Sequence, residues 1–459
     1  MAGETQKFDA IIVGAGQAGP PLAGRLTAAG QTVAVIERKL IGGTCVNSGC
    51  IPTKTLVASA HAAHLARRGA EYGVGTGDIT VDMAKVKARK DKVMLDDRHG
   101  VESWLEGMDG CTLIRGHARF ESPHTIRVDG QVLEADKIFL NVGGRAVVPD
   151  LPGLSDIDFL TNVSILELDT APEHLVIIGG SYIALEFAQM YRRFGARVTV
   201  IEKGPRLASR EDEDVSAAIK EILEAEGIDV VVGATAIQIA NRDDGFEVVP
   251  KEGAAPIAGT HLLLAVGRRP NTDDLGLEQA GVQTDGRGYI VVDDQLRTNV
   301  EHIWAMGDCN GRGAFTHTSY NDFEIVAANL LDGIPRRVSD RITTYALYID
   351  PPLGRAGMTV DQVRKSGRKA LVGKRPMTRV ARAVEKGETK GFMKVVVDAE
   401  TDEILGAAIL GVGGDEVVHA ILDVMSAKAP CITLSRTMHI HPTVSELVPT
   451  LLQEMKPLS

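Results

Sequence analysis

Long apolar runs are missing from this sequence, and their absence excludes one class of protein. No uninterrupted apolar stretch approaches the roughly 18 residues that a membrane-spanning helix needs, so we predict a protein with no membrane span. The first residues, MAGETQKFDAIIVG, also lack the basic segment followed by an apolar one that marks a secretion signal. We therefore expect a cytoplasmic protein.

Net positive charge is missing as well. The chain has 61 acidic and 50 basic residues, which gives a formal net charge of -11 at pH 7. Binding of nucleic acid needs a clustered basic surface that displaces counterions from the phosphates. We therefore predict no nucleic-acid partner and expect small molecules instead.

Cysteine is scarce, with five in 459 residues. An odd and sparse set is unlike the dense, even frameworks of small secreted proteins. Two of the five, Cys45 and Cys50, lie within the segment GGTCVNSGCIPTK (42–54). In a reducing compartment such a close pair is more typical of catalysis than of a structural cross-link. The other three are Cys111, Cys309 and Cys431, for which the sequence indicates no role.

Two segments repeat the pattern of a dinucleotide-binding unit. Residues 8–38 and 174–203 each combine an apolar strand, a glycine-rich turn, a helix and a second apolar strand that ends in glutamate. One such turn could be an ordinary glycine-rich loop, but two copies with matched acids favour two dinucleotide sites. The spacing from first glycine to acid is the same in both copies, Gly14 to Glu37 and Gly179 to Glu202.

The glycines of the first copy have separate physical purposes. Gly14 permits the tight turn, Gly16 lets the backbone approach a pyrophosphate, and Gly19 allows close packing of helix on strand. The N-terminus of the helix then receives the phosphates. Because Pro20 and Pro21 are tolerated only in the first turn of a helix, we expect this helix to begin near Gly16.

The second copy departs from the pattern at two positions. Ser181 replaces the middle glycine and Ala184 the last one, so we expect weaker nicotinamide binding but not loss of the site. Glu37 and Glu202 can each accept hydrogen bonds from ribose hydroxyls. A carboxylate at Glu202 also repels a 2'-phosphate, which favours NADH over NADPH, although basic residues within 203–210 lie close enough to weaken that preference.

A third glycine-containing segment, TNVEHIWAMGDCNGRG (298–313), predicts an apolar strand that ends at Gly307 and Asp308. At the carboxyl end of a strand, Asp308 is placed to bind a ribityl or ribose hydroxyl. The alternative is an ordinary turn aspartate.

The surroundings of the two cysteines favour redox chemistry. An undistorted helix would not bridge Cys45 and Cys50, because residues five apart lie about 7.5 Å apart along the axis and on different faces. Gly49 relaxes the backbone, and Pro52 removes a helical N–H, so the first turn can deform. The alanine-rich segment from Thr53 predicts a helix whose N-terminus lowers the pKa of nearby thiols. Two zinc ligands and coincidentally buried cysteines are the alternatives.

Together these motifs resemble the flavin-dependent pyridine nucleotide disulfide oxidoreductases, a family that includes dihydrolipoamide dehydrogenase, glutathione reductase and mercuric reductase. The resemblance implies an α/β fold with two Rossmann-like dinucleotide-binding domains, as in glutathione reductase, and an α+β C-terminal dimerisation domain. The implied domains are an FAD-binding domain in two parts (1–148 and 274–340), an NAD(P)-binding domain (149–273) and a dimerisation domain (341–459). The segments that carry the resemblance are IIVGAGQAG, GGTCVNSGCIPTK, GGSYIALEF, AVGRRPNT, WAMGDCNG and HIHPTVSE.

The resemblance also implies the cofactors, FAD in the first site and NADH or NADPH in the second. It implies that Tyr182 covers the nicotinamide pocket. The FAD contacts implied first are Gly14, Gly16, Gly19, Glu37 and Asp308. The further predicted cofactor contacts are Gly43, Thr44, Lys54, Gly143, Gly179, Glu202, Gly267 and Gly307.

Roles for the reacting residues follow from the same resemblance. Cys50 would lie against the flavin as the charge-transfer thiol, and Cys45 would be the interchange thiol that meets the substrate. Lys54 would sit near flavin N5 and pair with Glu186. Hydride would pass from nicotinamide to flavin, and electrons would then pass to the disulfide and on to the substrate.

The C-terminal segment RTMHIHPTVSE (436–446) matches the family's His-Pro-Thr signature. His441 would be the general acid and base, oriented by Glu446, and histidine suits that role because the ordinary pKa of this residue type, about 6.5, lies near the working pH. In the family this pair comes from the other subunit, so the resemblance implies a homodimer.

The electron acceptor is the least defined part of the resemblance. GGTCVNSGC, Cys309 and the segment 348–367 are similar to short mercuric-reductase-like proteins and to copper-reducing flavoproteins of reactive-chlorine resistance. The tail LVPTLLQEMKPLS lacks the cysteine pair of dedicated mercuric reductases, and PPLGRAG departs from the Pro-Glu stretch of dihydrolipoamide dehydrogenases. We expect reduction of a small disulfide or of a thiol-bound soft metal ion. The alternatives are a dihydrolipoamide dehydrogenase that uses NAD and a flavin redox sensor without turnover.

Overall fold

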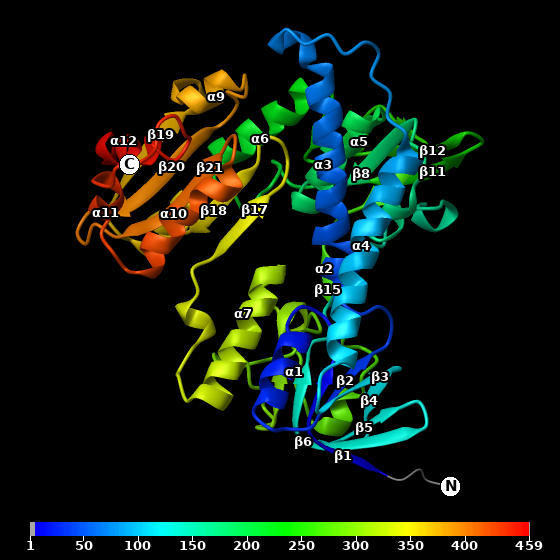
Figure 1. Ribbon diagram of the computed structural model, residues 1–459. Helices are drawn as coiled ribbons and strands as arrows, with labels where there is room; N and C mark the ends of the chain where they lie inside the picture. Colours follow the sequence, from blue (N-terminus) through cyan, green and yellow to red (C-terminus); the bar gives the residue numbers. More distant parts are fainter. Residues whose placement is uncertain (1–4, 459) are drawn as a thin grey trace.

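The computed structural model describes residues 5–458. Three sheets dominate it, one in the lower part of Figure 1, one at the upper right and one at the upper left. None of the helices within residues 5–458 is long and apolar enough to cross a lipid bilayer.

The first sheet runs in the order β3-β2-β1-β6-β5-β4, and β16 pairs with β6 beside this path. The pairs among β3, β2, β1, β6 and β16 are parallel, whereas β4 and β5 are antiparallel to their neighbours. β16 comes much later in the chain than β6: Asn141, directly after β6, and Met306, directly after β16, are 165 positions apart. The chain therefore leaves this sheet and later returns to it. The strands are β1 (Gln6–Val13), β2 (Val33–Glu37), β3 (Cys111–Arg115), β4 (Ala118–Phe120), β5 (Thr125–Val128), β6 (Gln131–Leu140) and β16 (Ile303–Ala305).

The second half of the central strand β1, residues 10–13, is buried on both faces, as expected where a parallel strand is a continuous apolar run. Ala10 and Ile12 pack into the cluster beneath α1 (Gly19–Ala28) and α7 (Thr316–Ala327). Ile11 packs into the cluster on the opposite face. The sheet therefore holds the glycine turn after β1 between two packed layers.

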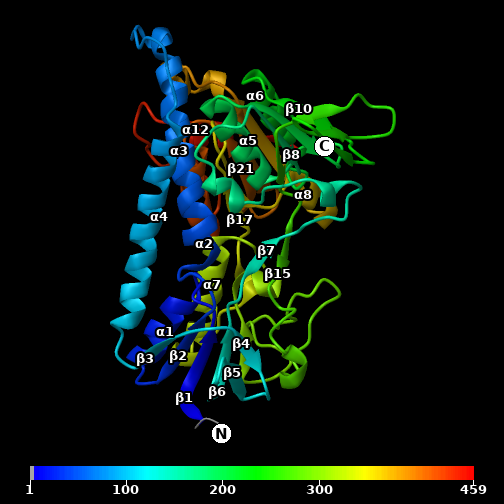
Figure 2. The same cartoon turned by 90° about the vertical axis from the view of Figure 1, so that its right-hand side faces the viewer.

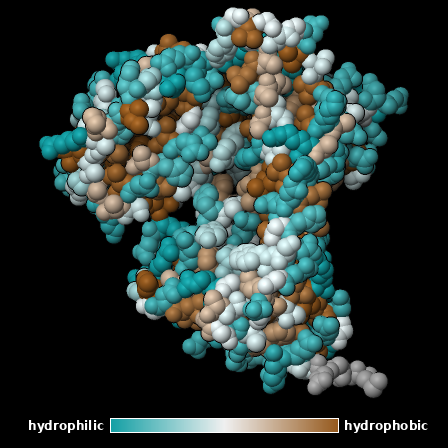
Figure 3. Space-filling model, viewed as in Figure 1, coloured by the Kyte–Doolittle hydropathy of each residue, from teal (hydrophilic) through white to brown (hydrophobic). Residues whose placement is uncertain are grey.

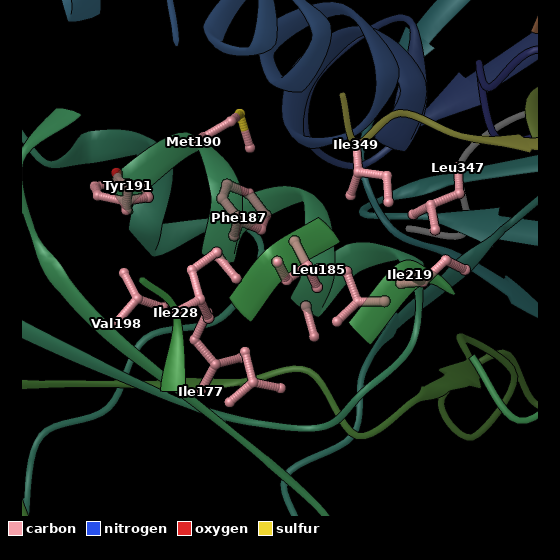
Figure 4. Close-up of a cluster of buried hydrophobic side chains, with 14 of the residues drawn as sticks. Ile177, Leu185, Phe187, Met190, Tyr191, Val198, Ile219, Ile228, Leu347 and Ile349 are labelled. Carbon is pink, nitrogen blue, oxygen red and sulfur yellow. The ribbon is translucent and has the colours of Figure 1, made fainter. Parts of the chain in front are cut away.

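The second sheet is parallel, in the order β10-β9-β8-β14. Figure 4 shows its core, where side chains of α5 pack against strands of the sheet and against two residues of the C-terminal part, Leu347 and Ile349. Two smaller antiparallel sheets accompany it, β11-β12-β13 and β7-β15. The elements are β7 (Gly144–Ala146), β8 (His174–Ile178), α5 (Tyr182–Phe194), β9 (Arg197–Glu202), α6 (Glu213–Ala225), β10 (Asp229–Val232), β11 (Gln238–Arg242), β12 (Gly245–Val249), β13 (Ile257–Gly259), β14 (His261–Leu264) and β15 (Arg268–Pro270).

The third sheet is antiparallel and comes from the last quarter of the chain, in the order β17-β18-β21-β20-β19-β22. Its core combines the inner faces of the strands with α10 and α12. The elements are β17 (Thr344–Leu347), β18 (Leu353–Gly357), α8 (Val360–Ser366), β19 (Ala370–Pro376), α9 (Ala381–Glu385), β20 (Phe392–Asp398), β21 (Ile404–Leu410), α10 (Gly414–Ser426), α11 (Ile432–Ser435), α12 (Leu447–Gln453) and β22 (Lys456–Pro457).

Two long helices join the lower part of the molecule to the upper part. α3 (Cys50–Arg67) and α4 (Met83–Glu106) run side by side along the molecule in both views (Figures 1 and 2). The short helix α2 (Gly43–Ser48) precedes α3. Single-turn helices connect the elements at Gly69–Tyr72, Leu154–Asp156, Ser164–Glu167, Leu277–Ala280, Gly307–Asn310, Ala328–Asp332, Val338–Asp340 and Met377–Arg379.

Two predicted helix starts are wrong by about one turn. The helix after the first glycine turn begins at Gly19 and not near Gly16, because the turn itself extends to Ala18 and both prolines then fall in the first helical turn. The helix after the cysteine motif begins at Cys50 and not at Thr53. Cys45 belongs to the separate helix α2, and the chain breaks between the two at Gly49.

Candidate active site

A cavity of about 2270 Å³ opens between the three sheets. Figure 3 shows that the surface is hollowed between the upper parts of the molecule and the lower part. The predicted site residues that line the cavity are Gly14, Gly16, Glu37, Gly43, Thr44, Cys45, Cys50, Lys54, Gly143, Tyr182, Glu186 and Asp308. The predicted residues outside its lining are Gly19, Gly179, Glu202, Gly267, Gly307, His441 and Glu446.

The turn after β1 requires glycine for steric reasons. Gly14 has a φ of +104°, and a Cβ on it would lie 2.3 Å from the carbonyl oxygen of Asn141. A Cβ on Gly19 would lie 2.4 Å from the carbonyl oxygen of Gly14, so helix and turn pack without room for a side chain. The Asn141 side chain accepts a hydrogen bond from the Gly19 N–H and donates one to the Met306 carbonyl. Asn141, which the sequence reasoning missed, thus joins this turn to the segment after β16.

Glu37 ends β2 with its carboxylate facing the turn. It accepts hydrogen bonds from the backbone N–H of Ala15 at 3.0 Å and of Lys39 at 2.8 Å. These bonds hold the carboxylate at the lining of the cavity, at the point where a ribose could meet it.

The segment after β16 is held by a buried aspartate that the sequence reasoning also missed. The Asp322 carboxylate accepts hydrogen bonds from the Gly307 N–H at 2.7 Å and from the Asn310 side chain at 2.8 Å, and it pairs with Arg341. The neighbouring Asp308 lines the cavity, where burial raises its pKa and Arg268, 3.4 Å away, opposes that rise.

The two cysteines are close together as free thiols, each partly buried. Gly49 separates α2 from α3, and a Cβ on it would lie 2.8 Å from the Thr44 carbonyl oxygen. This close approach folds Cys45 back toward Cys50, so that each thiol affects the pKa of the other. Among residues 5–458 no group of three or more His, Cys, Asp or Glu side chains is arranged to hold a metal ion, which leaves the zinc alternative without a ligand set.

The surroundings of the pair make the two thiols unequal. The hydrogen bond from Cys45, helped by Thr316 and by the positive charge of Lys54, lowers the pKa of Cys50 to about 6. The same hydrogen bond and burial raise the pKa of Cys45. Of the two thiols, Cys50 is therefore the one that loses its proton more readily.

Thr316 is a further contact that the sequence reasoning missed. Its Oγ1 lies 3.1 Å from the Cys50 Sγ, and Thr316 is the first residue of α7. The N-terminal end of a helix favours a nearby negative charge. No local signal marks this residue, because it lies 266 positions from Cys50.

Lys54 and Glu186 form the ion pair that the resemblance implied. Lys54 Nζ lies 2.7 Å from Glu186 Oε2, and the Glu186 side chain is 3 % exposed. The second oxygen of Glu186 accepts a hydrogen bond from the backbone N–H of Tyr348 at 3.0 Å. The Lys54 ammonium also lies 4.5 Å from the centre of the Tyr348 ring.

Aromatic rings line the cavity beside this ion pair. Tyr182 begins α5, and its ring centre lies 5.4 Å from that of Phe315. Phe315 in turn stacks on Tyr345 and on His317, at 5.6 Å and 5.3 Å between ring centres. Burial raises the pKa of Tyr182, so its hydroxyl stays neutral.

The second glycine turn follows the geometry of the first. Gly179 has a φ of +122°, and a Cβ on it would lie 2.4 Å from the Ala265 carbonyl oxygen. Glu202 ends β9 and accepts a hydrogen bond from the Gly204 N–H at 2.6 Å. Ser181, which replaces the middle glycine, is exposed at the start of α5. Gly267 has a φ of +134° and open space where a Cβ would stand.

His441 and Glu446 pair with each other but lie away from the cavity. His441 Nδ1 is 2.9 Å from Glu446 Oε2, and the His441 side chain is 74 % exposed. Its neighbours Met438 and Ile440 are among the most exposed apolar residues of the described chain. Within a single chain this pair does not reach the cysteines.

Comparison with known proteins defines the class. Residues 8–322 match the pyridine nucleotide-disulphide oxidoreductase family, and residues 343–452 match the dimerisation domain of that family. The chain belongs to the pyridine nucleotide-disulphide oxidoreductase family and is a flavoprotein disulfide oxidoreductase. The predicted fold class and enzyme class are confirmed, and the family implies FAD and NAD(P)H as cofactors.

Individual relatives share the full length of the chain. The probable pyridine nucleotide-disulfide oxidoreductase RclA of Escherichia coli is 37% identical over 448 residues, which cover 96% of this chain and 97% of the relative. A dihydrolipoyl dehydrogenase of Geobacillus stearothermophilus is 32% identical over 446 residues (96% and 94%). A mercuric reductase of Bacillus cereus is 32% identical over 447 residues (94% and 70%).

Solved structures agree with this grouping. The HOCl-induced flavoprotein disulfide reductase RclA from Escherichia coli superposes with a TM-score of 0.89 at 36% identity, covering 97% of this chain and 99% of that one. The Cu(II) complex of the same reductase superposes with a TM-score of 0.90 at 35% identity, covering 98% and 99%.

Proposed function

We propose that this protein uses NADH to reduce a small disulfide through FAD and the Cys45–Cys50 pair. The observation that carries the proposal is the position of Cys45 and Cys50 in the cavity lined by the first glycine turn. There Thr316 Oγ1 lies 3.1 Å from the Cys50 sulfur, and Cys45, Thr316 and Lys54 lower the pKa of Cys50. The overall reaction consumes NADH, a proton and one disulfide and yields NAD⁺ and two thiols.

The residues that line the cavity suit FAD. Gly14 and Gly16 have no side chains, so a pyrophosphate can approach the backbone before the N-terminus of α1. The carboxylates of Glu37 and Asp308 can accept hydrogen bonds from the ribose or ribityl hydroxyls of the cofactor. When bound, FAD carries the electron pair of NADH to the Cys45–Cys50 disulfide. We propose that the predicted residues of the first site bind FAD. We also propose that the FAD-binding domain comprises residues 1–148 and 274–340, the NAD(P)-binding domain residues 149–273 and the dimerisation domain residues 341–459.

In the reduced enzyme the two thiols have different tasks. Cys45 gives its proton to His441 of the partner subunit as its sulfur attacks one sulfur of the substrate disulfide and forms a mixed disulfide. The other sulfur leaves as a thiolate and takes that proton from His441 of the partner subunit. The Cys50 thiolate then attacks Cys45, which restores the Cys45–Cys50 disulfide and releases the second thiol. The low pKa of Cys50 keeps this second nucleophile ready at neutral pH.

The proton for the leaving thiolate comes, in this proposal, from His441 of the partner subunit. Support comes from the exposed position of His441, its hydrogen bond to Glu446 and the match of residues 343–452 to a dimerisation domain. A histidine held at Nδ1 by a carboxylate presents Nε2 for proton transfer. The active protein is therefore proposed to be a homodimer.

We propose NADH as the reductant over NADPH. The Glu202 carboxylate ends β9, where it can accept bonds from a ribose and would repel a 2'-phosphate. Lys203, Arg206 and Arg210 are the basic residues that could offset this repulsion, and of these Arg206 donates instead to the carbonyls of Ser209 and Glu211. A higher kcat/KM for NADPH than for NADH would contradict this choice.

The direct test is an anaerobic titration of the purified flavoprotein with NADH. A long-wavelength absorbance band from a thiolate beside the flavin should appear in the native protein and be absent in Cys50→Ser. Cys45→Ser should show the band without any reductant, since its Cys50 cannot form the disulfide. Bleaching of the flavin in the native protein with no such band would contradict the proposed relay.

A second acceptor class is a soft metal ion, and the likeness to the Cu(II) complex of a disulfide reductase favours it. NADH consumption by the native protein with Cu(II), with small disulfides or with lipoamide separates metal reduction, disulfide reduction and dihydrolipoamide dehydrogenase activity. Activity with lipoamide alone would favour the dehydrogenase. No turnover with any acceptor would favour a flavin redox sensor.

A further inference from the structure

One aromatic residue contacts both members of the Lys54–Glu186 ion pair. Tyr348 directly follows β17, its ring centre lies 4.5 Å from Lys54 Nζ, and its backbone N–H donates to Glu186 at 3.0 Å. We propose that Tyr348 is a positioning residue whose ring holds the Lys54 ammonium group beside the Cys50 sulfur. The inference rests on the proposed role of Cys50 as the thiolate of the relay.

The ammonium group of Lys54 needs more than one contact to stay in place. It stands at the end of a flexible four-carbon chain, and the Lys54 side chain is 32 % exposed. The carboxylate of Glu186 attracts it from one side, and the face of the Tyr348 ring attracts it from another. The backbone N–H of Tyr348 also holds the Glu186 carboxylate in place through its hydrogen bond. The Tyr348 ring, the Lys54 ammonium and the Glu186 carboxylate therefore form one unit.

This unit lies where it can act on Cys50. Lys54 follows Cys50 by four residues on α3, which places both side chains on one face of the helix. The charge of Lys54 lowers the pKa of Cys50, whereas the charge of Glu186 raises it. The distance of the ammonium from the sulfur, relative to that of the carboxylate, therefore decides how well the thiolate is stabilised.

Several other charged groups face these residues. Burial raises the pKa of Tyr348, and the charges of Asp415 and Glu416 at the start of α10, of Glu186 and of Cys50 add to that rise. The tyrosine therefore offers a neutral ring and no charge of its own. Cys50 faces Cys45 on α2 and Thr316 on α7, and Asp97 on α4 acts on Cys45. These groups are unchanged when only the ring of Tyr348 is removed.

The test measures the thiolate of Cys50 in the flavin-loaded Cys45→Ser protein, by titrating the long-wavelength band with pH. Tyr348→Leu, added to this background, should raise the apparent pKa of the band by about half a unit to one unit, a three- to tenfold loss of thiolate at a pH near that value. Tyr348→Phe keeps the ring and should titrate as the parent does. Tyr72→Leu is the matched control, because it removes another tyrosine that contacts a cation, Arg68 at 5.5 Å.

Each outcome decides the matter. An unchanged titration of Tyr348→Leu would overturn the proposal, and so would an equal shift in Tyr348→Phe, which would assign the effect to the hydroxyl. If Tyr348→Leu does not retain flavin, Tyr348→Met is titrated in its place. If the Cys45→Ser protein has no band at any pH, the proposed relay fails, and the pH dependence of Cys50 alkylation then tests the role of Tyr348 separately.

Discussion

At the scale of single residues, the site depends on how Cys50 is surrounded. The sulfur receives a hydrogen bond from its own motif, through Cys45, and another from Thr316 on a distant helix. The positive charge of Lys54 lowers the pKa of Cys50 further. Because each contact favours the charged form, the thiolate of Cys50 is present above a pH of about 6.

We predict that Thr316→Val raises the pKa of Cys50. Valine keeps the shape of threonine but cannot donate to the sulfur, and a hydrogen bond to a charged group contributes about 1.5 kcal/mol or more, which is about one pKa unit. The thiolate band of the Cys45→Ser protein should then need a correspondingly higher pH. Thr27→Val, whose hydroxyl bonds only to carbonyls of its own helix, is the control. If the thiolate band of the Thr316→Val protein titrated at the same pH as that of the Thr27→Val control, the Thr316 hydroxyl would not stabilise the thiolate.

The sequence reasoning found residues of one kind and missed those of another. Cys45, Cys50 and Glu37 stand in short local motifs, and all three line the cavity. Thr316 and Tyr348 carry no motif of their own, and they meet Cys50 and Lys54 only because α7 and β17 fold back onto α3. A local pattern cannot report a contact made across hundreds of residues.

At the scale of elements, one partly buried polar cluster joins three parts of the chain. Asp350, in the loop after β17, lies 2.7 Å from Arg193 of α5 and 2.8 Å from His61 of α3. Its backbone N–H donates to Gln189 at 2.7 Å, and Arg193 also pairs with Glu226. Burial opposes the charge of Asp350, but His61 and Arg193 lower its pKa well below the ordinary value.

We predict that Asp350→Asn destabilises the protein at neutral pH. The substitution removes the charge of Asp350 and leaves Arg193 paired only with the Glu226 carboxylate. This change should lower the free energy of unfolding by about 1–3 kcal/mol. Because the folded-state pKa of Asp350 is depressed, its contribution is present above the unfolded value of about 4 and is lost as the pH falls further.

Thermal unfolding of the flavin-loaded protein checks this prediction. The Tm difference between native and Asp350→Asn protein should be largest near pH 7 and should shrink below pH 4. Asp96→Asn, on an exposed part of α4, should leave Tm nearly unchanged at both pH values. A difference between native and Asp350→Asn protein that grew on acidification would contradict the sign argued for Asp350.

Element boundaries were the weaker part of the sequence reasoning. The patterns located the strand, turn and helix of both dinucleotide units, since apolar runs and glycines mark them directly. The exact starts of α1 and α3 were misplaced, because proline and glycine allow several starting points within one turn and only packing selects among them.

At the scale of the whole molecule, we predict that each active site needs two chains. His441 is exposed and lies outside the cavity of its own chain, so Cys45→Ser and His441→Gln homodimers should both be nearly inactive in disulfide reduction. When equal amounts are unfolded and reassembled together, half of the dimers are mixed and each has one intact site. Activity should return to about a quarter of the native value.

Each variant reassembled alone is the control and should stay inactive. If the mixture also stayed inactive although mixed dimers were detected by mass, His441 would serve the cysteines of its own chain, or neither.

The sequence by itself determined the chemistry that this protein carries. Two glycine turns with matched acids, a cysteine pair between glycines and a proline, and a C-terminal histidine signature are all local patterns, and local patterns are read without a fold. The family resemblance also implied that Cys50 is the charge-transfer thiol. Only the tertiary structure decided which groups from distant parts of the chain surround that thiol. Thr316 reaches the Cys50 sulfur from α7, and the Tyr348 ring reaches Lys54 from the end of β17, because electrostatic effects depend on distance in space rather than on distance along the chain.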